Sequence, residues 1–170
     1  MPLAPELEAI EGAQELYDWF GHWPSFHDAE VVSLHLNRVG PSSLVVHTWE
    51  MTSQVDDHNY FILAKHVVVE FVLIEVSELE LGGFSSQNVV FALDIKKLDE
   101  GFRLRLAPCY GLAGTIEAKT VRIHLTPGKA IRSATGKNID LRPLKCGAES
   151  CNAILGDWPT TKSGCVVNSP

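Results

Sequence analysis

The N-terminal residues carry a helical pattern of apolar positions. Apolar side chains recur there at steps of three and four residues, which places them on one face of a helix: Leu7, Ile10, Ala13, Tyr17 and Phe20. Glutamates occupy the other faces, and the early ones suit the positive end of the helix dipole. Pro5 is favourable in a first turn, and Gly21 can end a helix in the left-handed conformation. The pattern predicts one helix over residues 5–20.

The pattern then changes to a period of two, which is typical of a half-buried strand. We expect the apolar face of the first strand to carry Val32, Leu34 and Leu36. Residues 40–43 have the composition of a turn, and residues 44–50 resume with β-branched and aromatic side chains. These two segments predict a hairpin, and we expect a polar loop over residues 52–59.

Later segments predict further strands. Residues 67–74 are apolar on both faces apart from one glutamate, which indicates an interior strand at the centre of the sheet. Two more strands are expected over residues 88–96 and 102–108. In the second of these, Arg103 and Arg105 should form an exposed basic stripe among acidic neighbours.

The apolar phase slips once more near the end of this region. Ile116 and Ala118 lie on the opposite parity to Val121 and Ile123, which predicts a bulge or short turn near residues 119–120. About seven strands with short connections favour an antiparallel meander or sandwich, because a βαβ fold needs crossover helices that are missing. The expected fold class is therefore α+β, with an N-terminal helix followed by a mostly antiparallel sheet.

Composition limits the domain organisation and the partners. The 170 residues are enough for one domain, which we place at residues 1–127; residues 128–170 should form an irregular C-terminal extension. The start of the chain lacks the features of a secretion signal and no apolar run could span a membrane, so we expect a cytoplasmic protein. A net charge of −7 argues against nucleic-acid binding and permits a basic protein partner.

The cysteines and polar loops do not form a recognisable metal motif. An unsecreted chain should keep its thiols reduced. Cys146 and Cys151, with four intervening residues, lie at the loose edge of zinc-ligand spacing, Cys165 is distant, and a second tight pair is missing. Residues 56–59 lack the glycine turn and distal glutamate of a calcium loop, so they predict a hairpin tip. His35, His47 and His124 would make a metal site only if three strands brought them together. We expect no metal and no cofactor.

The most distinctive motif joins the helix to the first strand: Trp23-Pro24-Ser25-Phe26-His27-Asp28-Ala29-Glu30. One hypothesis is structural, with Trp23 and Phe26 filling the junction while Ser25 and Asp28 bind turn amides. A second is contact with a partner or ligand. A third makes His27, Asp28 and Glu30 an acid/base pair or metal ligands.

We favour the structural hypothesis because adjacent His and Asp side chains point apart on a strand. The sequence also lacks a G-x-S-x-G nucleophile motif, and its Gly111 to Gly114 segment has no following helix to bind phosphate. That segment predicts a hairpin turn. No catalytic residue is therefore expected.

The junction motif, together with Phe84 and Gln87-Asn88-Val89-Val90, resembles the immunity protein 50 family of bacteria over roughly residues 17–126. The resemblance implies a non-enzymatic α+β protein that is encoded beside a polymorphic toxin and binds and neutralises it. The motif residues that it singles out, for structure or for partner contact, are Trp23, Ser25, Phe26, His27, Asp28, Glu30, Phe84, Gln87 and Asn88.

The preferred functional hypothesis is thus a small intracellular binding protein with a cognate toxin as its partner. Trp49 and Trp158 are candidate exposed anchors for that partner, whereas Trp23 is expected in the core. One alternative is a small metal-dependent or ligand-binding enzyme centred on His27, Asp28 and Glu30. Another is a structural module that forms a homodimer through a sheet edge or the C-terminal extension.

Overall fold

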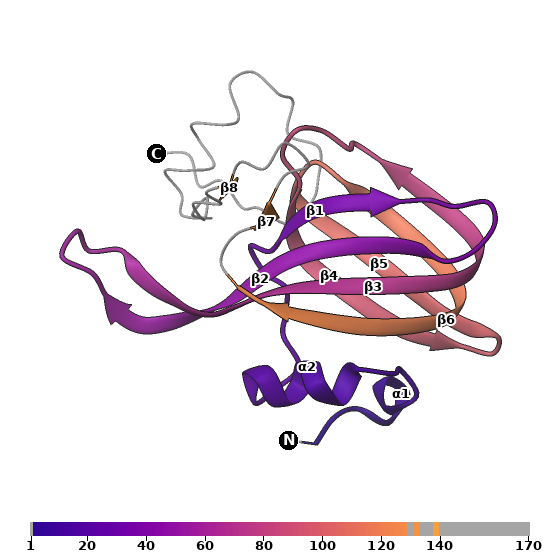
Figure 1. Ribbon diagram of the computed structural model, residues 1–170, viewed down its shortest axis with the longest axis horizontal. Helices are drawn as coiled ribbons and strands as arrows, with labels where there is room; N and C mark the ends of the chain where they lie inside the picture. Colours follow the sequence, from indigo (N-terminus) through magenta and orange to yellow (C-terminus); the bar gives the residue numbers. More distant parts are fainter. Residues whose placement is uncertain (1, 129–130, 133–137, 140–170) are drawn as a thin grey trace, which may run out of the picture.

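A computed structural model of the chain describes residues 2–128, 131–132 and 138–139. Six antiparallel strands close into a barrel in the order β1-β2-β3-β6-β5-β4, and two short strands, β7 and β8, pair separately (Figure 1). The element bounds are α1 Pro5–Glu8, α2 Ala13–Phe20, β1 Glu30–His35, β2 Ser42–Val55, β3 Phe61–Gly82, β4 Val89–Leu98, β5 Gly101–Tyr110, β6 Ala113–Pro127, β7 Ile131–Arg132 and β8 Asn138–Ile139. Neither helix in the described part of the chain has the length and apolarity needed to span a membrane.

The antiparallel sheet is confirmed, but the α+β class is confirmed only in part because the structure is mainly β. The sheet is also a closed barrel, whereas we expected a meander or a sandwich. The strand order places β3 and β4 on opposite sides of the barrel, so the segment between them crosses one barrel end. Closure leaves the six strands without free edges along the paired lengths.

The single helix predicted over residues 5–20 is wrong, since the segment forms two helices separated at Gly12. Gly12 adopts a left-handed φ of 84°, and a side chain there would collide with the backbone oxygen of Ile123. The carbonyl of Glu11 accepts a hydrogen bond of 2.8 Å from the Ile123 amide. The chain therefore leaves the helical path so that its backbone can dock on β6. The predicted apolar face is nevertheless turned inward, with Tyr17 half-buried and the others buried: Leu7, Ile10, Ala13 and Phe20.

Alternate residues of the strands fill the barrel. The strand predicted over residues 67–74 lies within β3, between β2 and β6, and the strands predicted over 88–96 and 102–108 correspond to β4 and β5. Fully buried side chains from these strands and their neighbours include Leu44, Val46, Val67, Val69, Phe71, Leu73, Leu104 and Ile116. The predicted basic stripe is confirmed, since Arg103 pairs with Glu117 and Arg105 lies 3.6 Å from Asp94.

Two irregularities change the parity of the strands. A register shift between Val31 and Ser33 turns Val31 toward the core in place of the predicted Val32. Leu34 packs against the core as predicted, whereas Leu36 lies half-exposed beyond β1. The phase slip near residues 119–120 is confirmed, although β6 continues through it. Opposite Lys119, Glu75 adopts a left-handed φ of 54° and the two side chains form an ion pair of 3.1 Å.

β2 and β3 run past the barrel and form a two-stranded projection, which we call the arm (residues 50–62; Figure 1). The polar loop predicted over residues 52–59 is therefore too long, because β2 continues to Val55. The tip itself is the turn expected around Asp56, whose Oδ1 accepts hydrogen bonds from the amides of His58 at 2.9 Å and Tyr60 at 2.8 Å. The predictions for Cys146, Cys151, Trp158 and Cys165 lie outside the described residues.

Candidate functional site

The backbone of the junction motif closes the barrel. β1 and β4 share one registered pair, Glu30 with Val89. Three further hydrogen bonds lengthen this seam: the Asp28 amide to the Val90 carbonyl (2.9 Å), the Val90 amide to the Ala29 carbonyl (2.8 Å), and the Val31 amide to the Asn88 carbonyl (2.9 Å). The two sequence motifs, about sixty residues apart along the chain, thus meet at the seam, where peptide groups need partners to be stable.

The junction is a tight turn and not an extended strand. Phe26 and Asp28 both adopt left-handed φ values, 56° and 63°, and the Ala29 amide donates to the Phe26 carbonyl at 3.1 Å. This geometry rotates neighbouring side chains toward each other, and His27 Nδ1 lies 3.1 Å from Asp28 Oδ2. The expectation that His27 and Asp28 point apart is therefore wrong, because it assumed strand geometry.

Aromatic side chains fill the space beneath this turn. Phe26 is 1% exposed, and its ring meets the rings of Phe71 and Trp23 edge to face, at centroid distances of 5.7 and 6.4 Å. Trp23 is half-buried and packs against the core. Ser25 Oγ accepts a hydrogen bond of 3.3 Å from the His27 amide. The turn is held by ring packing below and by short-range hydrogen bonds above.

The second motif fixes the segment that crosses the barrel end. Asn88 is buried, and its Oδ1 accepts hydrogen bonds from the amides of Ser85 and Leu112, both at 3.0 Å. Its Nδ2 donates to the Ser85 carbonyl at 2.9 Å. The Gln87 carbonyl accepts from Ser85 Oγ at 2.7 Å, whereas the Phe84 side chain is 60% exposed. Asn88 thus ties the crossing segment to the predicted hairpin turn between β5 and β6.

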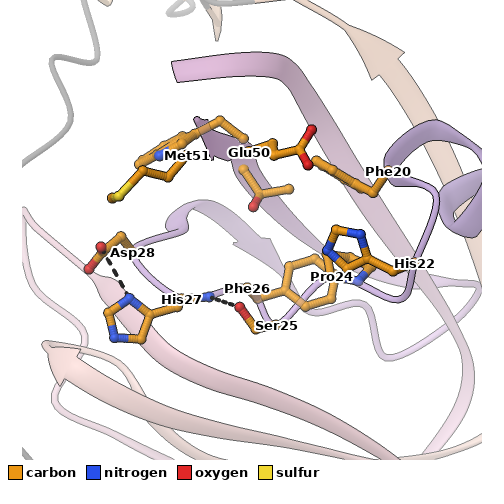
Figure 2. A pocket seen from close by; sticks show the side chains of 11 residues that line it. Phe20, His22, Pro24, Ser25, Phe26, His27, Asp28, Glu50 and Met51 are labelled. Carbon is orange, nitrogen blue, oxygen red and sulfur yellow. Dashed lines mark hydrogen bonds and ion pairs between the residues drawn. The ribbon is translucent and has the colours of Figure 1, made fainter. Parts of the chain in front are cut away.

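A cleft of about 370 Å³ lies between the junction and the root of the arm. One wall comes from α2 and the junction motif, and the other from residues 48–51 of β2. Figure 2 shows Glu50 and Met51 across the cleft from Ser25 and His27. The cleft and the arm are therefore continuous through β2.

Lys65 holds α2 against the root of the arm. A register shift between β2 and β3 places Lys65 in a left-handed conformation with a φ of 49°. Its ammonium group donates to the Phe20 carbonyl at the end of α2 and pairs with Glu50, each at 3.0 Å. The Trp19 indole donates back to the Lys65 carbonyl at 3.0 Å. One bulged residue thus fixes the angle between helix and arm.

The structure also brings Cys109 of β5 to the junction. The Cys109 sulfur, one imidazole nitrogen of His27 and one Asp28 carboxylate oxygen all lie within 4.8 Å of one another. Glu30 is not part of this group, although burial raises the pKa of its carboxyl group. The spacing of residues along the chain gives no indication of Cys109, because its approach to His27 and Asp28 depends on closure of the barrel. The proposed trio of His27, Asp28 and Glu30 is therefore not the cluster that the fold assembles.

A second group of rings lies behind the cleft wall. His47 is fully buried on β2, stacked on His66 at a centroid distance of 5.4 Å and packed against Trp49 at 5.2 Å. Burial, reinforced by repulsion from His66, lowers the pKa of His47 to about 4, while the Gly128 backbone acts in the opposite direction. Trp49 is only 9% exposed, so the prediction that it is an exposed anchor is wrong.

Together these features define a small closed antiparallel barrel with a projecting arm and a cleft at the arm's root. Residues 12–126 match the family model of immunity protein 50, which covers more than half of the chain, and the chain belongs to that family. The resemblance seen in the sequence motifs is thereby confirmed. No curated protein and no solved structure matches the chain.

Proposed function

We propose that this protein is a non-enzymatic immunity protein of the bacterial cytoplasm that neutralises a cognate toxin by covering its functional surface. Membership of the immunity protein 50 family supports the toxin as the partner. The observation that carries the proposal is the arm, which projects from the barrel (Figure 1). Its exposed apolar side chains lie outside the barrel core. We place the toxin interface on the arm and on the cleft at its root.

The arm exposes large hydrophobic side chains that the barrel does not use. Each of the five is between 41% and 54% exposed: Met51, Val55, Tyr60, Phe61 and Ile62. Several exposed apolar side chains on one projecting element are typical of a protein interaction site. Because Met51 also lines the cleft, a partner side chain inserted there would contact the arm at the same time.

The edges of the arm can also accept a strand. β2 pairs with β1 only as far as His47, and β3 pairs with β6 only from Val67 onward. Toward the tip, the outer edges therefore lack a neighbouring strand among the described residues. Unpaired edge amides and carbonyls are a template for strand addition by a partner.

The charge of the arm selects a basic partner. Residues 50–62 contain Glu50, Asp56 and Asp57 and no lysine or arginine, and the whole chain carries a net charge of −7. A basic toxin surface would be attracted to this element, whereas a second copy of the chain would bring like charges together. The charge therefore favours a toxin over a homodimer as the occupant of the arm.

The test compares two exposed positions on one strand. Phe61→Ser removes an arm side chain that is 52% exposed, and Leu79→Ser removes a barrel side chain of β3 that is 42% exposed. We expect Phe61→Ser to weaken binding of the toxin encoded beside the gene at least tenfold by calorimetry, and to reduce protection of cells. Leu79→Ser should bind within twofold of the unchanged protein.

Three results would contradict the proposal. Equal losses for the two variants would remove the arm from the interface. A wild-type protein that neither binds nor protects would remove the toxin as partner. Concentration-dependent dimerisation in sedimentation, lost in Phe61→Ser, would identify the arm as a homodimer contact instead.

A further inference from the structure

We propose that His27, Asp28 and Cys109 form a binding site for a divalent transition-metal ion, and that zinc is the ion that fits best. Their three ligand atoms lie within 4.8 Å of one another. Zinc binds such atoms at about 2.0–2.3 Å, which separates neighbouring ligands by roughly 3.3–3.6 Å. The 3.1 Å between His27 Nδ1 and Asp28 Oδ2 is close to this spacing, and metal binding would draw in the Cys109 sulfur, which lies within 4.8 Å of the other two ligand atoms.

Backbone irregularities on both sides produce this convergence. The left-handed turn at Asp28 brings two adjacent side chains together. On β5, Val89 pairs with Tyr110 while Val90 pairs with Pro108, so Cys109 is the extra residue of a bulge. Bulges re-aim side chains and are frequent next to functional sites. The same seam hydrogen bond, from the Asp28 amide to the Val90 carbonyl, fixes the turn beside the bulge.

The carboxylate of Asp28 supplies an independent observation. The Asp28 side chain is only 9% exposed, and its contact with His27 involves Oδ2. Its Oδ1 is buried and has no hydrogen-bond partner among the described residues. A buried oxygen left in this state costs about 1–3 kcal/mol, and more when it is charged. A bound cation would neutralise the carboxylate and remove that penalty, which the ion pair with His27 alone does not.

The donor set decides which metal is bound. Thiolate and imidazole ligands favour zinc, whereas magnesium and calcium prefer oxygen ligands throughout. Three protein ligands leave a fourth tetrahedral position for water or for a donor atom of a bound partner. The sequence does not predict this metal site, because Cys109 lies far along the chain from His27 and Asp28 and no ligand spacing connects them.

The experiment uses the full chain, stripped of metal and then titrated with Zn²⁺ in a calorimeter or with Co²⁺ in a spectrophotometer. We expect one ion per chain and a thiolate-to-cobalt charge-transfer absorption in the near ultraviolet. Cys109→Ser should abolish that absorption, and both Cys109→Ser and His27→Ala should weaken Zn²⁺ binding at least tenfold.

The chain offers a matched control. The triple variant Cys146→Ser, Cys151→Ser, Cys165→Ser removes every other thiol and should bind Zn²⁺ like the unchanged protein. Loss of binding in the triple variant, or unchanged binding and charge transfer in Cys109→Ser, would overturn the proposal. Circular dichroism of each metal-free variant separates a lost ligand from a lost fold, and the toxin-protection assay is scored independently.

Discussion

Phe26→Ala tests whether the junction holds the barrel together. The Phe26 side chain is 1% exposed and packs on the rings of Phe71 and Trp23. Truncating a buried phenylalanine to alanine costs about 3–5 kcal/mol, through lost burial and the cavity that remains. Alanine, like phenylalanine, has a Cβ and would adopt the same φ of 56° at position 26, so the substitution relieves no backbone strain. We expect the full cavity penalty.

Such a loss is a large part of the stability of a small protein, which is usually about 5–15 kcal/mol. In a chain of this size, each kcal/mol shifts the melting temperature by about 2–4 °C. Phe26→Ala should therefore melt roughly 6–20 °C lower than the unchanged protein. Circular dichroism during heating measures the melting temperature, and circular dichroism during urea titration measures the free energy of unfolding.

Phe84→Ala is the matched control, because Phe84 belongs to the second sequence motif but its side chain is 60% exposed. That variant should change the free energy of unfolding by less than about 1 kcal/mol. If the free energies of unfolding of the two variants differ by less than about 1 kcal/mol, the ring of Phe26 does not support the junction and the argument for the seam fails.

Two further predictions concern buried polar groups. Leu112 is 2% exposed, and Asn88→Ala leaves its backbone amide without a hydrogen-bond acceptor. The variant should lower the free energy of unfolding in urea by about 2–3 kcal/mol. Asn37→Ala, at an exposed turn, should lower it much less. Equal effects would show that Asn88 does not clamp the barrel end. His47 has a pKa lowered to about 4, against an ordinary value of 6.5, so between these pH values the unfolded chain takes up a proton that the folded chain excludes. Stability should fall as the pH drops from about 6.5 to 4, and His47→Phe should flatten that part of the profile; an unchanged slope would exclude His47 as its cause.

Local patterns predicted the strands of the barrel well. The apolar run over residues 67–74 and the arginine pair at Arg103 and Arg105 depend on neighbouring positions only. The run forms a strand with neighbours on both edges, although alternate residues are only half-buried, and the exposed arginine stripe is confirmed. Where a distant backbone decides the conformation, the pattern was misleading. α1 ends at Glu8 and α2 begins only after Gly12, where the backbone approaches Ile123, and nothing within residues 5–20 encodes that contact.

The same distinction applies to the candidate site. The composition of the junction motif is distinctive, but its geometry depends on left-handed residues at 26 and 28, and a bulky residue such as Phe26 seldom adopts that conformation. Cys109 enters only through the bulge of β5 and the closure of β1 on β4. The polar composition of residues 52–59 predicts a loop, because polar residues such as Thr52 and Gln54 are common in loops. Pairing with β3 instead extends β2 to Val55.

Closure of the barrel explains the backbone of the junction but not the identity of its side chains. The seam uses the amide of Asp28 and the carbonyl of Ala29, and most residues could supply these groups. A left-handed turn would be easier to form with glycine or asparagine than with a charged aspartate whose side chain is buried. Placing a carboxylate there, next to His27 and beside Cys109, adds an electrostatic penalty that the seam does not require. The ion pair with His27 offsets part of that penalty, and a cation bound by the three side chains would offset the rest. The metal titration therefore tests the side chains of this turn, whereas the Phe26 measurement tests its packing.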